Sequence, residues 1–194
     1  MPRRKTPFIQ GHFYHIYGRG NNKQQVFFEK DDYLFFLHRL KKYLPPPLIR
    51  LHAYCLMPNH YHMLVEIRNP CDFSHLMQNF LISITKSTNK KYERVGHLFQ
   101  GQFGGKVVDT KEYMLTLSRY IHTNPFFAGL SEFHTEWRYS SYRDYLGLRS
   151  GSFVYCDGIL SHFRDRREYA EFVEGYSRKE SEDFRSAGDF GSRS

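Results

Sequence analysis

The sequence is poor in cysteine and contains no long apolar run. Its three cysteines, Cys55, Cys71 and Cys156, are widely spaced and odd in number, which argues against a disulfide framework and indicates a reducing compartment. No uninterrupted apolar stretch approaches the roughly 20 residues of a membrane-spanning helix. The basic first 13 residues lack the apolar segment of a signal peptide. We therefore expect a cytoplasmic protein without a membrane partner.

Positive charge and aromatic side chains are abundant instead. The 194 residues carry 28 Lys and Arg against 20 Asp and Glu, a formal net charge of +8, and they include 18 Phe and 15 Tyr. This length suits one well-formed core plus an extension. A basic, aromatic-rich chain favours an anionic partner with flat faces, and nucleic acid is the obvious candidate. A basic globular protein without a polyanionic partner remains the alternative.

Apolar periodicity predicts an alternation of strands and helices. Strands are expected at residues 12–17, 48–57, 60–68 and 102–108. Helices are expected at residues 29–42, 72–92 and 109–123. The third helix is expected to end at Asn124, because Pro125 follows and the residue before a proline disfavours helical geometry.

The element order predicts the fold class. The first six elements, β-α-β-β-α-β, match the ferredoxin-like split βαβ pattern. We therefore expect an α/β fold of the α+β type, with a ferredoxin-like domain and antiparallel sheet over residues 1–148. Residues 149–177 are expected to form a C-terminal helical extension. Residues 178–194, rich in Ser, Gly, Arg and Asp, are predicted to be a disordered tail.

Two histidines stand two positions apart at the start of the third predicted strand. Because strand side chains alternate between faces, His60 and His62 point the same way. They follow a Pro58-Asn59 turn, and two imidazoles on one face can hold a divalent cation. The alternative is a pair of exposed or hydrogen-bonded histidines without a metal.

The third predicted helix carries a tyrosine and an asparagine one turn apart. Tyr120 and Asn124 are four residues apart, which places them roughly on one helix face. Most helical tyrosines simply pack, and this chain has 15, so by itself this pattern favours a core residue over a catalytic one.

A structural zinc site is a weaker interpretation. His52-x2-Cys55 and Cys71-x3-His75 imitate zinc-finger spacing. However, His52 and Cys55 fall within a predicted strand, where alternation is expected to point them to opposite faces.

Four spaced segments carry a family resemblance. The segments are Tyr17-Gly18-Arg19-Gly20-Asn21-Asn22, Met57-Pro58-Asn59-His60-Tyr61-His62-Met63-Leu64-Val65, Arg119-Tyr120-Ile121-His122-Thr123-Asn124-Pro125 with Ala128-Gly129-Leu130, and Trp137-Arg138-Tyr139-Ser140-Ser141-Tyr142. Together they resemble the REP-associated tyrosine transposases, relatives of the single-tyrosine HUH transposases of the IS200-like family, and the resemblance extends over roughly residues 8–175.

The resemblance implies an HUH endonuclease and strand transferase that cleaves and rejoins single-stranded DNA. Tyr120 matches the nucleophile, which forms a 5′-phosphotyrosine bond. His60 and His62 match the metal-binding histidines, and Asn124 matches the third ligand of a Mg²⁺ or Mn²⁺ ion. The implied partners are single-stranded hairpins of repetitive extragenic palindromes. Such a protein is expected to be a monomer or homodimer and to associate with the nucleoid when bound to DNA.

DNA contacts are predicted for five further residues on charge and position: Arg19, Asn21, Lys23, Lys86 and Arg119. The chain departs from the family pattern at Phe126-Phe127, where a Val-Arg pair is usual, and at Gln102, where arginine is common. Both departures place details of DNA contact in doubt. A catalytically silent DNA-binding protein of the same fold, recognising repeat hairpins, and an RNA-processing factor are the competing hypotheses.

Overall fold

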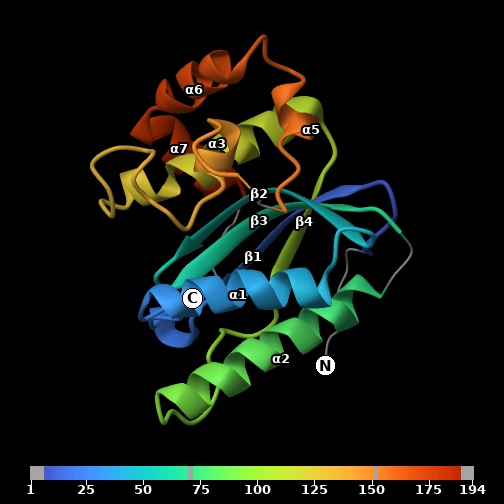
Figure 1. Cartoon of the computed structure of the whole chain (residues 1–194), viewed down its shortest axis with the longest axis vertical. Helices are drawn as coiled ribbons and strands as arrows, with labels where there is room; N and C mark the ends of the chain where they lie inside the picture. The colour runs from blue at the N-terminus through green and yellow to red at the C-terminus, as the bar shows by residue number, and fades with distance from the viewer. Residues whose placement is uncertain (1–6, 70–71, 151–152, 189–194) are drawn as a thin grey trace.

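The fold is built on a four-stranded antiparallel sheet (Figure 1). The computed structural model describes residues 7–69, 72–150 and 153–188. The sheet has the order β2-β3-β1-β4, which is that of a ferredoxin-like βαββαβ unit. The predicted α+β fold is therefore confirmed. The strands are β1 (Phe13–Arg19), β2 (Ile49–Met57), β3 (His60–Ile67) and β4 (Gly104–Val108).

Two helices cover one face of the sheet, α1 (Lys30–Tyr43) and α2 (Phe73–Lys91). Each begins at an acidic residue: Glu29 and Asp32 form a capping box at α1, and the Asp72 carboxylate accepts from the His75 amide at α2. Apolar side chains fill the space between helices and strands. They include Tyr14, Ile16, Met63, Phe36 and Phe80.

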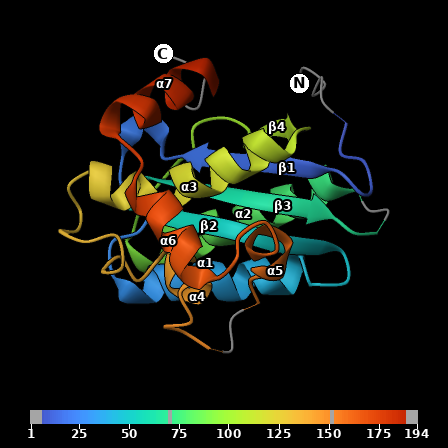
Figure 2. The same cartoon turned by 90° about the horizontal axis from the view of Figure 1, so that it is seen from above.

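The opposite face of the sheet is covered by α3 (Lys111–Phe127) and by chain that follows it (Figure 2). A second core cluster joins α3 to the sheet and to the C-terminal helices. Those helices are α4 (Tyr142–Tyr145), α5 (Asp157–Leu160), α6 (Arg166–Glu174) and α7 (Arg178–Gly188). No helix within the described ranges is both long and apolar enough to cross a membrane.

The prediction that the third helix ends at Asn124 is wrong. α3 continues through Pro125 to Phe127. Proline lacks an amide proton, so it cannot donate to the carbonyl of Ile121, but the next turn closes normally with the Ala128 amide donating to the Asn124 carbonyl at 3.0 Å. Pro125 is itself buried, and this packing offsets the lost bond. Tyr120 and Asn124 consequently lie on one unbroken helix.

The disordered tail expected from residue 178 is replaced by helix α7 over Arg178–Gly188. A capping box begins this helix: the Ser177 amide donates to the Glu180 carboxylate at 2.8 Å, and the Glu180 amide donates to the Ser177 hydroxyl at 3.2 Å. Phe184 then packs against Tyr113 and Tyr120 of α3. The remainder of the predicted tail, residues 189–194, lies outside the described residues.

A β-bulge interrupts strand β2 between Leu51 and Ala53. It breaks the alternation on which the argument about His52 and Cys55 depended. His52 is buried and bonds the Glu66 carboxylate at 3.3 Å. Cys71, the other half of the zinc spacing, lies outside the described residues.

Candidate active site

The predicted histidine pair lies on the face of β3 that looks toward α3. The rings of His60 and His62 are 5.2 Å apart between centroids and nearly perpendicular. Antiparallel pairing sets His60 opposite Arg19 of β1 and His62 opposite Tyr17. Strand alternation therefore places both imidazoles on one side of the sheet, as the sequence predicted.

The hydrogen bonds of Asn59 fix which nitrogen of His60 faces the site. The Asn59 amide nitrogen donates to the Lys23 carbonyl at 3.2 Å, which leaves its Oδ1 as the acceptor for Nδ1 of His60 at 2.6 Å. His60 then carries its proton on Nδ1. Its Nε2 lone pair is left available to a metal ion.

A third histidine, missed by the sequence analysis, supports His62. Nε2 of His15 on β1 lies 2.9 Å from Nδ1 of His62, and both side chains are buried. This contact occupies Nδ1 of His62 and leaves Nε2 as the nitrogen that can bind a metal. Only the pairing of β1 with β3 brings the two residues together, because they are 47 positions apart in the chain.

Burial keeps these imidazoles neutral. It lowers the pKa of His60 to about 4, helped by the positive charges of Arg19 and Arg185. It lowers the pKa of His15 to about 3, with a further contribution from Lys106. The pKa of His62 is also well below its ordinary value, first through burial and then through its histidine neighbours. Neutral imidazole is the form that binds metals, so the pair is ready for a cation near neutral pH.

Helix α3 brings Tyr120 to the histidine pair within the same chain. The ring of Tyr120 lies 5.5 Å from that of His62, and only 2% of its surface is exposed. The Asn124 amide nitrogen donates to the Tyr120 carbonyl at 3.0 Å. Burial raises the pKa of the Tyr120 phenol, whereas a side-chain hydrogen bond with Asn124 and the charge of Arg185 act in the opposite direction. Tyr120 is thus as buried as a core residue, and its ring nevertheless lies beside the histidine pair.

These four residues share one pocket of about 280 Å³ with the C-terminal helix. His60, His62, Tyr120 and Asn124 form part of its wall. The α7 residues that line it were all missed from the sequence: Arg178, Ser181, Glu182 and Arg185. Their spacing of three, four and seven residues is the signal that could have identified one helix face.

The donor set fits a divalent cation. Two neutral imidazole nitrogens and an amide oxygen would leave coordination positions open for phosphate and water. No group of three or more His, Cys, Asp or Glu side chains in the described part of the chain could hold a metal ion. A third protein ligand beside the two histidines would therefore have to be of another type, and the amide side chain of Asn124 lines the same pocket.

The predicted DNA contacts fall in different parts of the molecule. Arg19 lines the pocket, and Asn21 and Lys23 lie in the short 3₁₀ turn Asn21–Lys23 beside the Pro58-Asn59 turn. Arg119 does not line it, and its guanidinium stacks on Tyr176 at 4.0 Å and on Phe172 at 4.4 Å. Lys86 lies on α2, on the opposite face of the sheet from the histidine pair.

Comparison with protein families identifies the chain. Residues 9–124 match the family model described as "Transposase IS200 like". The chain belongs to the IS200-like transposase family. The matched segment includes the histidine pair, Tyr120 and Asn124, and it ends within α3.

The fold of this IS200-like transposase also resembles a solved structure described as "Structure of the REP associates tyrosine transposase bound to a REP hairpin". The likeness has a TM-score of 0.64 at 16% sequence identity and covers 80% of this chain and 91% of that one. At this identity the likeness establishes the shared fold. No curated protein matches the chain.

Proposed function

We propose that this transposase cleaves and rejoins single-stranded DNA hairpins of repetitive extragenic palindromes, with Tyr120 as nucleophile and His60, His62 and Asn124 as metal ligands. The observation that carries the proposal is the placement of Tyr120 within 5.5 Å of His62, in a pocket that also contains His60 and Asn124. The hairpin substrate is supported by the likeness to a transposase solved with a REP hairpin.

The chemistry follows from the residues present. A bound Mg²⁺ or Mn²⁺ would withdraw charge from a phosphate oxygen and orient the phosphate for in-line attack. The Tyr120 phenol loses its proton as its oxygen attacks phosphorus. The bond from phosphorus to the 3′-oxygen breaks, and that oxygen takes up a proton and leaves as a 3′-hydroxyl. The resulting 5′-phosphotyrosine keeps the bond energy, so a later 3′-hydroxyl can displace Tyr120 and reseal the strand.

The electrostatics of the pocket suit this reaction. Burial opposes ionisation of the phenol, so the hydrogen bond with Asn124 and the positive charge of Arg185 are the features that favour the attacking oxyanion. Arg19, Arg178 and Arg185 give the pocket a positive lining for a phosphodiester, with Glu182 as its acidic member.

Covalent trapping tests the proposal. A labelled repeat hairpin from the same genome, incubated with Mn²⁺, should form a protein–DNA adduct that disappears in Tyr120→Phe. Tyr113→Phe is the matched control, because Tyr113 also lies on α3 and also packs against Phe184, and it should retain the adduct. If wild-type protein forms no adduct on any such hairpin and only retains DNA in a salt-sensitive manner, the silent binder is correct. RNA that competes as well as DNA would support the RNA-processing hypothesis.

The same geometry supports action in cis. Tyr120 and the histidine pair meet within one chain, so each protomer should hold a complete site. A mixture of His62→Ala and Tyr120→Phe proteins should therefore remain inactive. Restored adduct formation in the mixture would show that two chains share each site.

A further inference from the structure

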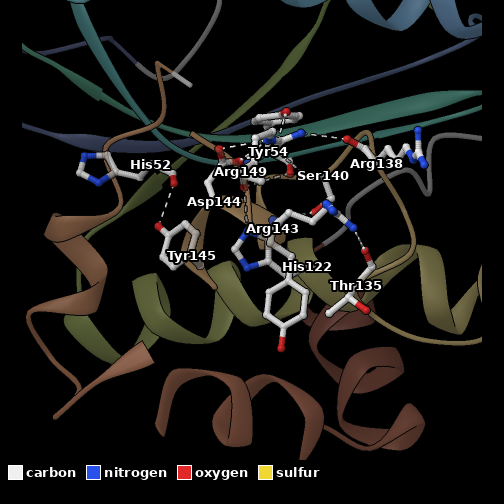
Figure 3. Close-up of polar contacts among 12 residues, drawn as sticks. His52, Tyr54, His122, Thr135, Arg138, Ser140, Arg143, Asp144, Tyr145 and Arg149 are labelled. Carbon is white, nitrogen blue, oxygen red and sulfur yellow. Dashed lines mark hydrogen bonds and ion pairs between the residues drawn. The ribbon is translucent and has the colours of Figure 1, made fainter. Parts of the chain in front are cut away.

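A buried chain of hydrogen bonds passes through His122, two residues after the proposed nucleophile. His122 is fully buried, and Figure 3 shows it near Tyr145. Its Nδ1 lies 2.7 Å from the Tyr169 hydroxyl of α6, and its Nε2 lies 2.7 Å from the Ser141 hydroxyl. One side chain of α3 thus bonds both α6 of the C-terminal extension and Ser141, whose neighbour Ser140 pairs with Cys55 of β2.

Each end of this chain terminates on backbone. At one end the Tyr169 hydroxyl donates to Ser118 at 3.2 Å, and Ser118 donates to the Leu115 carbonyl at 2.8 Å. At the other end the Tyr54 amide of β2 donates to Ser141 at 2.9 Å, and the Tyr54 carbonyl lies 3.2 Å from the same hydroxyl. These hydrogen bonds therefore connect α3 to β2 on one side and to α6 on the other.

Counting protons gives the chain a direction. Ser118 has a single hydroxyl proton, which it donates to Leu115, so it accepts from Tyr169. Tyr169 has then spent its own proton, and Nδ1 of His122 must supply the next one. The partners of His122 are hydroxyls rather than a carboxylate, so burial keeps the ring neutral and Nε2 carries no proton. Ser141 can give its single proton to Nε2 or to the Tyr54 carbonyl, and the contact with Nε2 is the shorter, at 2.7 Å against 3.2 Å. Nε2 therefore accepts from Ser141.

We propose that His122 is the residue that positions Tyr120, a role that rests on the proposed nucleophile. Residues two apart on a helix lie about 200° apart around its axis, so Tyr120 and His122 face opposite sides of α3. A rotation of α3 that moved Tyr120 away from His62 would break both bonds of His122. This chain of hydrogen bonds from Ser118 through Tyr169 and His122 to Ser141, here called the relay, fixes the rotation of α3. It thereby fixes the position of the attacking oxygen relative to His62.

Tyr169→Phe is the sharpest test because it keeps the aromatic ring and removes only the hydroxyl, which accepts the Nδ1 proton and donates to Ser118. Ser141 can turn its hydroxyl to the Tyr54 carbonyl, so the proton of His122 should move from Nδ1 to Nε2. Nitrogen-15 NMR of the ring should report this change of tautomer.

The rate of adduct formation should fall in this variant by between about tenfold and a hundredfold, since a displacement of about 1 Å has effects of that size. Hairpin affinity should stay within about twofold, because the surface that contacts DNA is unchanged. In protein with 3-fluorotyrosine at position 120, the fluorine-19 resonance should shift when Tyr169→Phe is introduced.

Tyr145→Phe is the matched control. Tyr145 is also fully buried and stacks on Tyr169 with ring centroids 4.7 Å apart, but its hydroxyl donates to the His52 carbonyl at 2.8 Å, outside the relay (Figure 3). It should lower the melting temperature about as much as Tyr169→Phe and leave the adduct rate, the tautomer and the fluorine signal unchanged.

Two outcomes would overturn the proposal. The first is a Tyr169→Phe protein that loses stability as the control does and keeps the wild-type adduct rate and fluorine signal, which would make the relay purely structural. The second is a wild-type His122 protonated on Nε2. If wild-type protein forms no adduct, the proposed function fails, but the tautomer and fluorine measurements still decide whether His122 orients Tyr120.

Discussion

The two faces of the sheet differ in role: one packs the apolar core, and the other forms the candidate site. Strand β3 sends Tyr61 and Met63 into the apolar core beneath α1 and α2, and it sends His60 and His62 toward α3. The first face contains ordinary core packing, and the second contains neutral histidines, a buried tyrosine and charged side chains of α7. Because side chains alternate, the packed face fixes the register that aligns the histidines; a slip of one residue would exchange the two sets.

Substituting adjacent residues of β3 should separate the two roles most strongly. His62→Ala removes a proposed metal ligand, so adduct formation should fall by about 10³-fold, corresponding to several kcal/mol of transition-state stabilisation. Met63→Ala opens a cavity in the core and should cost about 2–5 kcal/mol of unfolding free energy, while folded protein keeps its adduct rate. Chemical denaturation and adduct assays on both variants check the pair. Equal effects of the two variants on both measurements would contradict the division.

Acid should lower the stability of the protein through the buried histidines on the α3 side of the sheet. Burial lowers the pKa of His15 and of His122 to about 3. Histidines of the unfolded chain have their ordinary pKa near 6.5, so below about pH 6.5 the unfolded chain binds more protons than the folded protein. Stability is therefore fully present above about pH 6.5 and is lost as the pH falls. Between pH 7 and pH 5 each such histidine should remove about 2 kcal/mol from the unfolding free energy. Urea denaturation should show a shallower loss in His15→Leu, and an unchanged slope would contradict this account.

The C-terminal helix offers a smaller effect. Phe184 packs 5.2 Å from the Tyr120 ring and 5.5 Å from the Tyr113 ring, and contacts of this kind contribute about 0.5–1.5 kcal/mol. Phe184→Ala should speed amide hydrogen exchange in α7 and leave exchange in the sheet unchanged. Phe133→Ala is the control, because that ring is 63% exposed. Slow exchange in α7 of the Phe184 variant would show that other contacts hold the helix.

The smallest expected effect comes from comparing two predicted DNA contacts that lie on opposite faces of the sheet. Arg19 lines the pocket, whereas Lys86 is exposed on α2 across the sheet. Arg19→Ala should weaken hairpin binding and reduce the salt slope by about one, the effect of losing one phosphate contact. Lys86→Ala should change neither quantity. A larger effect at Lys86 in binding titrations at several salt concentrations would place DNA on the α1 and α2 face.

The elements that the sequence predicted well are those with strong apolar periodicity. β1 to β4, α1 and α2 follow from alternation, from helical spacing and from acidic caps, and the strand order follows from the βαββαβ pattern. The histidine pair was predictable because its two members share one strand, and Tyr120 with Asn124 because they share one helix.

What the sequence did not reveal depends on contacts between distant segments. His15 reaches His62 only through strand pairing, and its own neighbours in the chain give no sign of a site. α7 has low hydropathy and a single large apolar side chain, Phe184, so its composition resembled a tail although Ser177 and Glu180 form a capping box. The continuation of α3 through Pro125 depends on burial, which local propensity does not report.

The family match ends at residue 124, inside α3, yet the rings that enclose that helix come later in the chain. Tyr142, Tyr145 and Tyr169 are all fully buried against the second core cluster. A fragment cut where the similarity stops would expose this apolar surface and lose both partners of His122. The stretch by which the family is recognised is thus shorter than the packed unit around α3, and we expect a fragment that folds by itself to extend at least to α6.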